Sequence, residues 1–310
     1  MATSPTSDTT RLAVIGAGSI GTWLAVLADR AGIDTTLCVR SVPESLRVDT
    51  GQGPLEPRSV SVVERPEDLD GPVDWVVLTT KAHHTRGAAG WLGALTGPGT
   101  VVAAAQNGVD HLERLRPLTP EGTEILPALV YAAVESLAPG RVVHHAGNQV
   151  LVPAYSPAAE AFSRLWADTG VRVDAVEDFD LAAWRKLLTN LAANPLTALL
   201  GRRMGVFRQP EMAELAGAVL REAVAVGQAE GVGLTEEDVG RTLARYAENP
   251  PEGGTSMLYD RLAGRPMEHE HITGPVVRAA ARHGLQVPLN SALLTLIRVL
   301  EQEPPEGTGR

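Results

Sequence analysis

Short apolar runs, bounded by glycine or polar residues, dominate the first half of the chain. The first run, residues 12–15, leads into a glycine-rich segment and then into a helix-like stretch at residues 20–31. Gly32 ends that stretch, and residues 35–39 form a second apolar run of the kind found in buried parallel strands. Together these segments predict a strand–helix–strand unit of about thirty residues.

Three further apolar runs cover residues 60–63, 75–79 and 101–105, with helical stretches between the last two and after them. Strands that alternate with helices predict a parallel sheet with helices on both faces. Two later runs, residues 142–145 and 149–152, are candidates for a late, antiparallel pair that closes this sheet.

From about residue 179 the pattern becomes helical, and no strand-like run interrupts it. We therefore expect an α/β domain over residues 11–178 and an all-α domain over residues 179–302. Residues 1–10 and 303–310 are poor in apolar residues and are expected to be a disordered leader and tail. The expected helices cover residues 181–200, 211–230, 236–246, 256–263, 269–283 and 291–300.

The composition narrows the class of protein. A chain of 310 residues is longer than one core usually organises, which agrees with two domains. The formal net charge of −10 argues against a nucleic-acid partner, because phosphate-binding surfaces need clustered Lys and Arg. A single cysteine, Cys38, excludes an intramolecular disulfide and a cysteine-based metal cluster, and it fits a cytoplasmic location. No apolar run approaches the roughly 18 residues that a membrane span needs, so we expect no membrane partner.

A glycine motif of the form GxGxxG lies between the first predicted strand and the first predicted helix. Gly16 permits the tight turn, Gly18 lets a pyrophosphate approach the backbone, and Gly21 lets helix and strand pack closely. The N-terminus of the helix then offers free N–H groups to phosphates. We expect dinucleotide binding here, whereas the alternative is a tight turn without a ligand. The candidate cofactor residues of the motif are Gly16, Ala17, Gly18, Ser19, Ile20 and Gly21.

Arg40, next to Ser41 at the end of the second strand, indicates which dinucleotide binds. NAD-binding proteins usually place an acidic residue there, which accepts a hydrogen bond from the ribose 2′-hydroxyl. An arginine cannot accept that bond but pairs well with a 2′-phosphate, so the sequence favours NADP(H). The alternative is a solvated surface arginine. Lys81 follows another strand and is either a second cofactor contact or a surface residue.

A polar stripe crosses the first helix of the second domain. Lys186, Asn190 and Asn194 recur every four residues, so all three are expected on one helix face. Polar residues on an apolar helix need hydrogen-bond partners or a wet cleft. The stripe is therefore either part of an active site or an exposed face.

Three residues elsewhere are further candidates. Ser256 and Glu268 lie in one segment of the second domain, where Glu268 is either functional or a first-turn acid of the helix that follows. Asn107, in Gln106-Asn107-Gly108, follows a strand at the ligand-binding edge of the sheet, although Asn–Gly also favours a turn by itself.

These features occur together in one known family. GAGSIG, Arg40, Lys81, Gln106-Asn107-Gly108, WRKLLTNLAANPLTAL and SMLYDRLAGRPMEHEHITG follow one another along the chain. In this combination the chain resembles the ketopantoate reductase (2-dehydropantoate 2-reductase) family, from Arg11 to about Leu300. The resemblance implies a Rossmann-type α/β domain followed by an all-α domain like the C-terminal domain of 6-phosphogluconate dehydrogenase.

The resemblance also implies an activity, the NADPH-dependent reduction of 2-dehydropantoate to (R)-pantoate in pantothenate and coenzyme A biosynthesis. Lys186 is similar to the family's lysine that protonates the developing alkoxide, and Glu268 to the glutamate that helps to position the substrate. Ser256 resembles the serine that binds the substrate's carboxylate or hydroxyl. The matching asparagines are Asn190 and Asn194 on the substrate side and Asn107 between the cofactor ribose and the substrate.

Some segments depart from the family's usual pattern. Met267 stands where threonine is usual, and Gly253 and Gly254 occupy a stretch that often carries an asparagine near the substrate. Residues 128–136 and 151–155 also differ. These departures keep two alternatives open, a family member that reduces another 2-oxo acid as a D-2-hydroxyacid dehydrogenase does, and more remotely a non-catalytic NADPH-sensing protein. A homodimer is a possible assembly.

Overall fold

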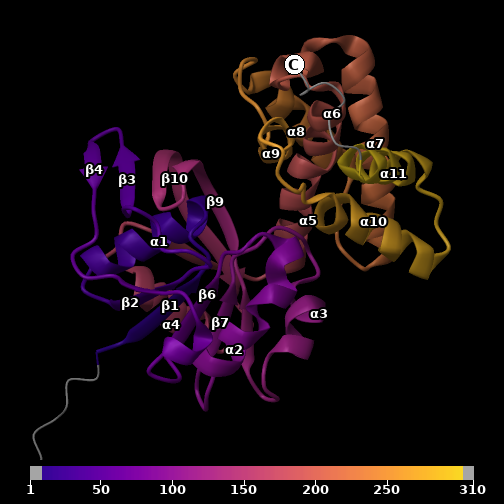
Figure 1. Cartoon of the computed structure of the whole chain (residues 1–310). Helices are drawn as coiled ribbons and strands as arrows, with labels where there is room; N and C mark the ends of the chain where they lie inside the picture. The colour runs from indigo at the N-terminus through magenta and orange to yellow at the C-terminus, as the bar shows by residue number, and fades with distance from the viewer. Residues whose placement is uncertain (1–8, 303–310) are drawn as a thin grey trace, which may run out of the picture. The chain divides into compact units, whose positions relative to one another are not determined.

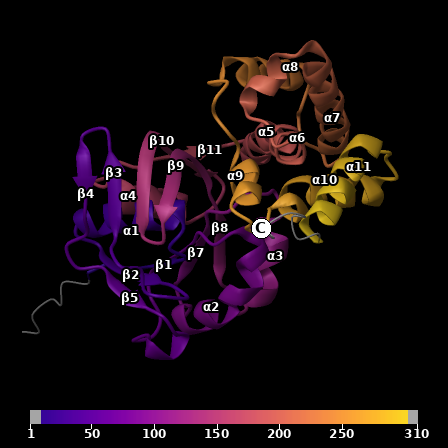
Figure 2. The ribbon, with the colours of Figure 1, turned by 45° about the horizontal axis from the view of Figure 1, so that its top comes forward.

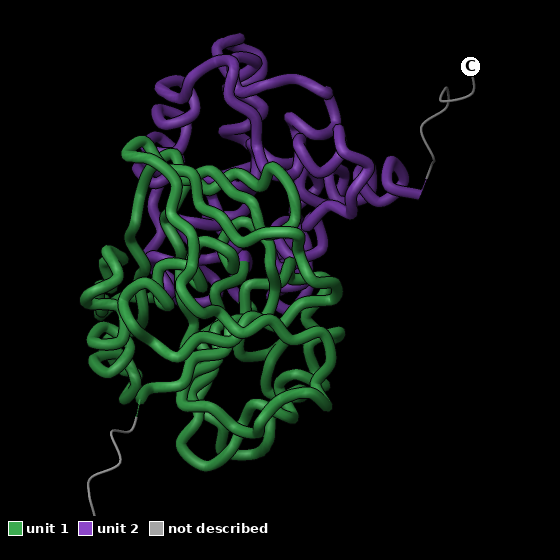
Figure 3. The backbone as a smooth tube through the Cα atoms, turned by 60° about the vertical axis from the view of Figure 1, so that its left-hand side comes forward, with its two compact units in different colours: residues 1–106, 110–179 green, residues 107–109, 180–310 purple. Residues whose placement is uncertain are grey.

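The computed structural model describes residues 9–302, so the predicted tail 303–310 and all but residues 9 and 10 of the predicted leader 1–10 lie outside it. Backbone contacts divide the chain into two compact units (Figure 3). Unit 1 contains residues 1–106 and 110–179, and unit 2 contains residues 107–109 and 180–310. Each unit has its own hydrophobic core.

Six parallel strands form the main sheet of unit 1, in the order β5-β2-β1-β6-β7-β8. Figure 1 labels the four central strands, β2, β1, β6 and β7. All residues of β6 are buried, as expected for a strand that is covered on both faces. The predicted α/β fold is confirmed, and β8 is an additional strand that the sequence analysis did not predict. The strands are β1 (Arg11–Ile15), β2 (Asp34–Cys38), β5 (Ser61–Val63), β6 (Trp75–Leu78), β7 (Val101–Ala104) and β8 (Glu124–Pro127).

Helices connect these strands. The first, α1 (Ser19–Arg30), begins after Gly18 and ends before Gly32, whose φ of 89° favours glycine. Its apolar residues, Trp23 and Leu24 among them, are buried in the core of unit 1. The other helices and 3₁₀ helices are η1 (Pro66–Asp68), η2 (Ala82–Ala88), α2 (Ala89–Leu95), α3 (His111–Leu115), η3 (Arg116–Leu118) and α4 (Ala159–Trp166).

Cys38 ends β2 and is buried as a free thiol. Burial raises the pKa of this thiol to about 12, because a thiolate would lose its hydration there. Cys38 is therefore protonated and unreactive at neutral pH.

A second sheet in unit 1 corrects the prediction for residues 142–145 and 149–152. The two runs do not pair with each other and do not join the main sheet; both belong to one long strand, β10 (Figure 2). Gly147, with φ 76°, lies between them where the pairing of β10 with β9 shifts its register. The polar interruption in the sequence is thus a bulge inside a strand, where a turn between two strands was expected. The strands are β3 (Arg47–Thr50), β4 (Gly53–Leu55), β9 (Leu129–Ala138), β10 (Arg141–Pro153) and β11 (Arg172–Val176).

The described residues of unit 2 form helices joined by loops and contain no strand, which confirms the predicted all-α domain. Its core is formed mainly by Leu, Val and Ala, with Trp184 and Tyr246 as the largest buried side chains. The elements are α5 (Phe179–Leu191), α6 (Ala193–Leu200), η4 (Met204–Arg208), α7 (Pro210–Ala229), α8 (Glu236–Glu248), α9 (Ser256–Leu262), α10 (His269–His283) and α11 (Pro288–Gln302).

The single helix predicted over residues 181–200 is broken into α5 and α6. Pro195 is the cause, because its ring excludes the carbonyl of Leu191, four residues earlier, and it has no N–H to donate. The hydroxyl of Tyr246 fills the gap. It lies 3.0 Å from the carbonyl oxygens of both Leu188 and Thr189 and accepts a hydrogen bond from the N–H of Ala193 at 3.3 Å.

Candidate active site

The glycine loop of unit 1 has the geometry that its sequence predicts. Gly16 has φ 110°, a conformation that L side chains rarely adopt. A Cβ on Gly21 would lie 1.8 Å from the carbonyl oxygen of Gly16, so only glycine allows this approach of helix and strand. A Cβ on Gly18 would meet no atom within 4 Å, which leaves the outer side of the loop open to a ligand.

Thr79 holds this loop in place, a role that the sequence analysis missed. The residue follows β6, which lies next to β1 in the sheet. Its hydroxyl lies 3.0 Å from the carbonyl oxygens of both Ile15 and Gly16. Nothing in the local sequence distinguishes Thr79 from an ordinary strand residue, because its role arises only when β1 and β6 become neighbours.

Arg40 and Lys81 lie at the same edge of the sheet as the glycine loop. Arg40 is exposed just beyond β2, and Lys81 is half-buried just beyond β6; β2 and β6 flank β1 on either side. Among the described residues, Arg40 has no ion-pair partner. Its guanidinium is therefore available to an anionic ligand.

Lys186, Glu268 and Asn107 form a polar cluster in unit 2. Lys186 is half-buried on α5, and burial lowers its pKa from 10.5 to about 8, against the opposing effect of the negative charge of Glu268. Glu268 is only 6% exposed and immediately precedes α10. The side-chain amide of Asn107 donates a hydrogen bond to Oε2 of Glu268 at 3.2 Å. The cluster thus joins a cation of perturbed pKa to a buried carboxylate.

Asn190, Asn194 and Ser256 line a pocket of about 350 Å³ in unit 2. The helix break does not separate the two asparagines, because Asn190 near the end of α5 and Asn194 at the start of α6 both line it. Lys186, Glu268 and Asn107 are not among the residues lining this pocket, but Lys186 lies one turn before Asn190 on α5. The remaining wall comes mainly from the end of α8 and the loop after it, through Arg245, Tyr246, Asn249, Pro250, Gly253 and Gly254.

Comparison with known proteins identifies the family. Residues 12–157 match the model described as "Ketopantoate reductase PanE/ApbA", and residues 178–301 match that described as "Ketopantoate reductase PanE/ApbA C terminal". The chain belongs to the ketopantoate reductase family. This membership and the Rossmann-like fold imply a nicotinamide cofactor.

Individual members of the family align over nearly the whole chain. The 2-dehydropantoate 2-reductase of Caulobacter vibrioides is 38% identical, covering 93% of this chain and 98% of its own length. That of Mycobacterium tuberculosis is 36% identical, covering 95% and 99%. The structure of a dimeric ketopantoate reductase from Staphylococcus aureus superposes with a TM-score of 0.85 at 27% identity, covering 94% and 99%.

The glycine loop fits the pyrophosphate of such a cofactor. The first turn of α1 contains no acidic residue, and no side chain caps its N-terminus. Its first N–H groups therefore remain available to phosphate oxygens, next to the open side of Gly18.

Asn194 provides the pocket with a hydrogen-bond donor that has no acceptor among the described residues. The side chain is 2% exposed, and its Nδ2 has no hydrogen-bond partner within the described chain. A buried amide without an acceptor costs about 1–3 kcal/mol, so a ligand oxygen here would recover that energy. The geometry therefore favours a ligand that brings a hydrogen-bond acceptor to this pocket.

Ser256 is positioned by the residue before it. Thr255 caps α9 by accepting a hydrogen bond from the N–H of Leu258 at 3.1 Å. The hydroxyls of Thr255 and Thr197, on α6, lie 2.7 Å apart. These bonds fix the first turn of α9, and hence Ser256, against the helix that carries Asn194.

The loop at the far wall of the pocket is braced by backbone hydrogen bonds. The N–H of Met204 donates to the carbonyl of Gly253 at 2.8 Å, and that of Gly205 donates to Pro251 at 2.9 Å. A Cβ on Gly254 would lie 2.7 Å from Cζ of Tyr259, so the ring of Tyr259 would have to shift to admit a side chain here. The two glycines that depart from the family's usual pattern thus make a thin, braced wall.

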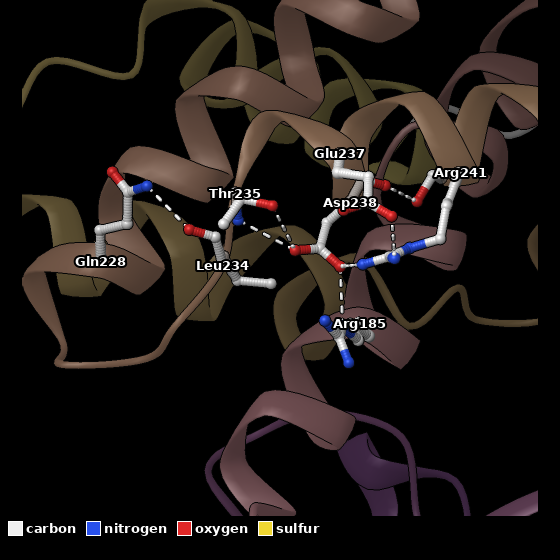
Figure 4. A network of polar contacts seen from close by, with 8 residues as sticks. Arg185, Gln228, Leu234, Thr235, Glu237, Asp238 and Arg241 are labelled. Carbon is white, nitrogen blue, oxygen red and sulfur yellow. Dashed lines mark hydrogen bonds and ion pairs between the residues drawn. The ribbon is translucent and has the colours of Figure 1, made fainter.

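The buried carboxylate of Asp238 ties α8 to Arg185 on α5, the residue that precedes Lys186 in the sequence (Figure 4). Asp238 Oδ1 accepts hydrogen bonds from Arg185 at 2.7 Å and Arg241 at 2.6 Å, and Oδ2 accepts one from the N–H of Thr235 at 2.9 Å. Burial alone would raise the pKa of Asp238, but these hydrogen bonds outweigh it and lower the pKa. The network holds α8, whose last turn carries Arg245, against the helix of Lys186.

Two features are absent from the residues that the structure describes, a membrane-spanning helix and a metal-binding group of side chains. Over residues 9–302, no helix is long and apolar enough to cross a membrane. In the same range no group of three or more His, Cys, Asp or Glu side chains is arranged to hold a metal ion.

Proposed function

We propose that this chain reduces 2-dehydropantoate to (R)-pantoate with NADPH. The observation that carries the proposal is Lys186, a lysine with a pKa near 8 beside Glu268 and one turn from Asn190 at a polar pocket. This is the chemistry expected of a group that gives a proton to an oxyanion near neutral pH. Relatives at 36–38% identity carry the name 2-dehydropantoate 2-reductase, which supports the same substrate.

The cofactor would be held at the carboxyl edge of the main sheet. The glycine loop receives the pyrophosphate through Gly16, Ala17, Gly18, Ser19, Ile20 and Gly21, and Arg40 pairs with the 2′-phosphate, so we assign NADP(H). Lys81 is a second cofactor contact, and Asn107 contacts both ribose and substrate. When bound, the reduced nicotinamide supplies the hydride.

The residues of unit 2 supply the proton and hold the substrate. Protonated Lys186 stabilises the negative charge that develops on the C2 oxygen and then donates its proton there. Glu268 keeps the lysine charged and is held in turn by Asn107. The substrate-binding residues are Asn190, Asn194 and Ser256, which line the pocket with donors for substrate oxygens.

A second candidate is the same reaction on another 2-oxo acid. The observation in its favour is the pocket wall at Gly253 and Gly254, where side chains are absent. A pocket wall without side chains leaves room for a different substituent on the substrate carbon next to the C2 carbonyl. We also propose that the protein acts in the cytoplasm and as a homodimer, because the Staphylococcus aureus ketopantoate reductase is described as dimeric.

The deciding experiment follows NADPH oxidation against a panel of 2-oxo acids that includes 2-dehydropantoate. We expect the highest kcat/KM with 2-dehydropantoate. A clearly higher value for another 2-oxo acid would establish the second candidate. Binding of NADPH without turnover of any member of the panel would reject both.

A further inference from the structure

Arg245 gives the pocket its charge. Thirteen residues line the pocket, all of them in the described chain, and Arg245 alone among them is charged. It has no ion-pair partner among residues 9–302, whereas Arg241, one turn earlier on α8, is bound to both Glu237 and Asp238. The pocket therefore combines one uncommitted cation with no carboxylate in its wall.

The charge of Arg245 acts at the pocket wall. Burial raises the pKa of Tyr246, and the positive charge of Arg245 is among the effects that oppose it. The hydroxyl of Tyr246 lies 3.0 Å from the carbonyl of Thr189, which lines the same pocket. Arg245 is exposed and directly precedes the residue whose hydroxyl bridges the break between α5 and α6, close to Asn190.

The neutral groups of the pocket complement this charge. Asn194 presents a buried Nδ2 with no acceptor among the described residues, and Ser256 presents a hydroxyl from the first turn of α9. A planar guanidinium matches a carboxylate with two parallel hydrogen bonds. A cation, an amide donor and a hydroxyl donor around about 350 Å³ suit a small organic anion with several oxygens.

Building on the proposed function, we propose that Arg245 is the carboxylate anchor of the 2-oxo acid substrate. Its guanidinium pairs with the C1 carboxylate, and Asn194 donates a hydrogen bond to another substrate oxygen. Lys186 acts at the C2 oxygen, where charge changes during the reaction. Arg245 acts on a charge that is the same before and during the reaction, so it determines which substrates bind.

Because Arg245 and Lys186 act on different groups of the substrate, their substitution should change different kinetic constants. A hydrogen bond to a charged group contributes about 1.5–3 kcal/mol, so Arg245→Gln should raise KM by about 10- to 100-fold. The value of kcat should change less than about threefold, because the lost interaction is equal in the ground and transition states. Arg245→Lys keeps the charge but not the planar fork, and it should give an intermediate KM.

A binding assay makes the inference independent of turnover. Oxamate, a non-reducible mimic of a 2-oxo acid, should raise the melting temperature of the wild type in the presence of NADPH and should have little effect on Arg245→Gln. The matched control is Arg221→Gln, which removes one positive charge from an exposed ion pair with Glu236 on α7 and α8. The methyl ester of the 2-oxo acid has no C1 charge, so its KM should be nearly equal in the wild type and Arg245→Gln.

Each result has one meaning. An unchanged KM in Arg245→Gln, or an equal rise in Arg221→Gln, would overturn the anchor. A rise in KM for acid and ester alike would also overturn it, because a pocket distorted by the mutation would not discriminate between them. If the wild type reduces no 2-oxo acid but oxamate still stabilises only proteins with Arg245, the proposed function fails and the anion site remains.

Discussion

A lysine with a pKa near 8 changes its charge within the range in which enzymes are usually assayed. Below that pH Lys186 carries the proton that the proposed mechanism gives to the alkoxide, and above it the proton is lost. We therefore expect kcat for reduction to be level at neutral pH and to fall as the pH rises through about 8. Lys186→Ala should lower kcat by about 10²- to 10⁴-fold at pH 7 and leave NADPH affinity nearly unchanged. A variant that keeps more than half of the wild-type kcat would remove Lys186 from the mechanism.

The effect of Glu268 on the pKa of Lys186 is opposite to that of burial. Its negative charge raises the pKa of Lys186 against the effect of burial, so Glu268→Gln should lower that pKa further. The descending limb of the kcat–pH profile is then expected to move to lower pH, while the amide can still accept the hydrogen bond from Asn107. A limb that stays in place would show that another group controls the rate.

The predicted preference for NADPH over NADH depends on Arg40. Arg40→Asp removes the proposed partner of the 2′-phosphate and places a carboxylate where NAD-binding proteins have one. NADPH should bind about 10- to 100-fold more weakly, and NADH should bind as well as before or better. Fluorescence titration of both cofactors would measure this. Equal affinity of the wild type for NADPH and NADH would reject the assignment.

At the scale of elements, the break between α5 and α6 depends on one hydroxyl. Tyr246→Phe leaves the carbonyls of Leu188 and Thr189 and the N–H of Ala193 without their partner in a buried place. The free energy of unfolding should fall by about 1–3 kcal/mol, and KM should rise because Asn190 and Asn194 lie on either side of the break. Urea unfolding of Tyr259→Phe is the control, since Tyr259 is 41% exposed and bonds only a loop N–H. Equal losses in both variants would argue against a special role for Tyr246.

The elements that the sequence predicted well are those whose burial is uniform. β1 and β6 are buried along their length and appear as continuous apolar runs, and the helices of unit 2 have regular amphipathic spacing. β9 was not predicted although residues 129–134 form an apolar run, and most of its residues are exposed or half-buried, unlike those of β1 and β6. β10 was divided in two because a bulge and a turn share the same glycine-containing signal.

The site residues that the sequence predicted are likewise those that belong to a local pattern. Gly16 to Gly21 and the repeat of Lys186, Asn190 and Asn194 are local patterns, and the sequence contained all that was needed to single them out. Thr79 and Tyr246 were not singled out, because each bonds a segment that is distant in the sequence. Arg245 was not singled out, because the pocket that it lines is formed by segments that only the fold brings together. Arg241 and Arg245 lie four residues apart on α8, a spacing that does not distinguish them from an exposed pair. Only the fold shows that Arg241 is bound to Glu237 and Asp238, whereas Arg245 has no ion-pair partner among residues 9–302.

The two units have separate hydrophobic cores over the described residues, one cluster in unit 2 and two in unit 1, and this bears on unfolding. Calorimetry is expected to show more than one transition, so that a single two-state fit fails. NADPH should raise the midpoint of one transition by mass action, by about 2.7 kcal/mol at a hundredfold excess over Kd. Asp238→Ala breaks a buried network of unit 2 and should lower the midpoint of the other. A single transition moved by both changes would show that the molecule melts as one cooperative unit.

The burial of Cys38 has a practical consequence for experiments of this kind. The chain has no other cysteine, and this thiol stays protonated and covered at neutral pH. Maleimide reagents should therefore leave the native protein unlabelled without any prior removal of cysteines. A cysteine introduced at an exposed position such as Tyr155, which is 67% exposed, would then carry a single dye or spin label at a known place.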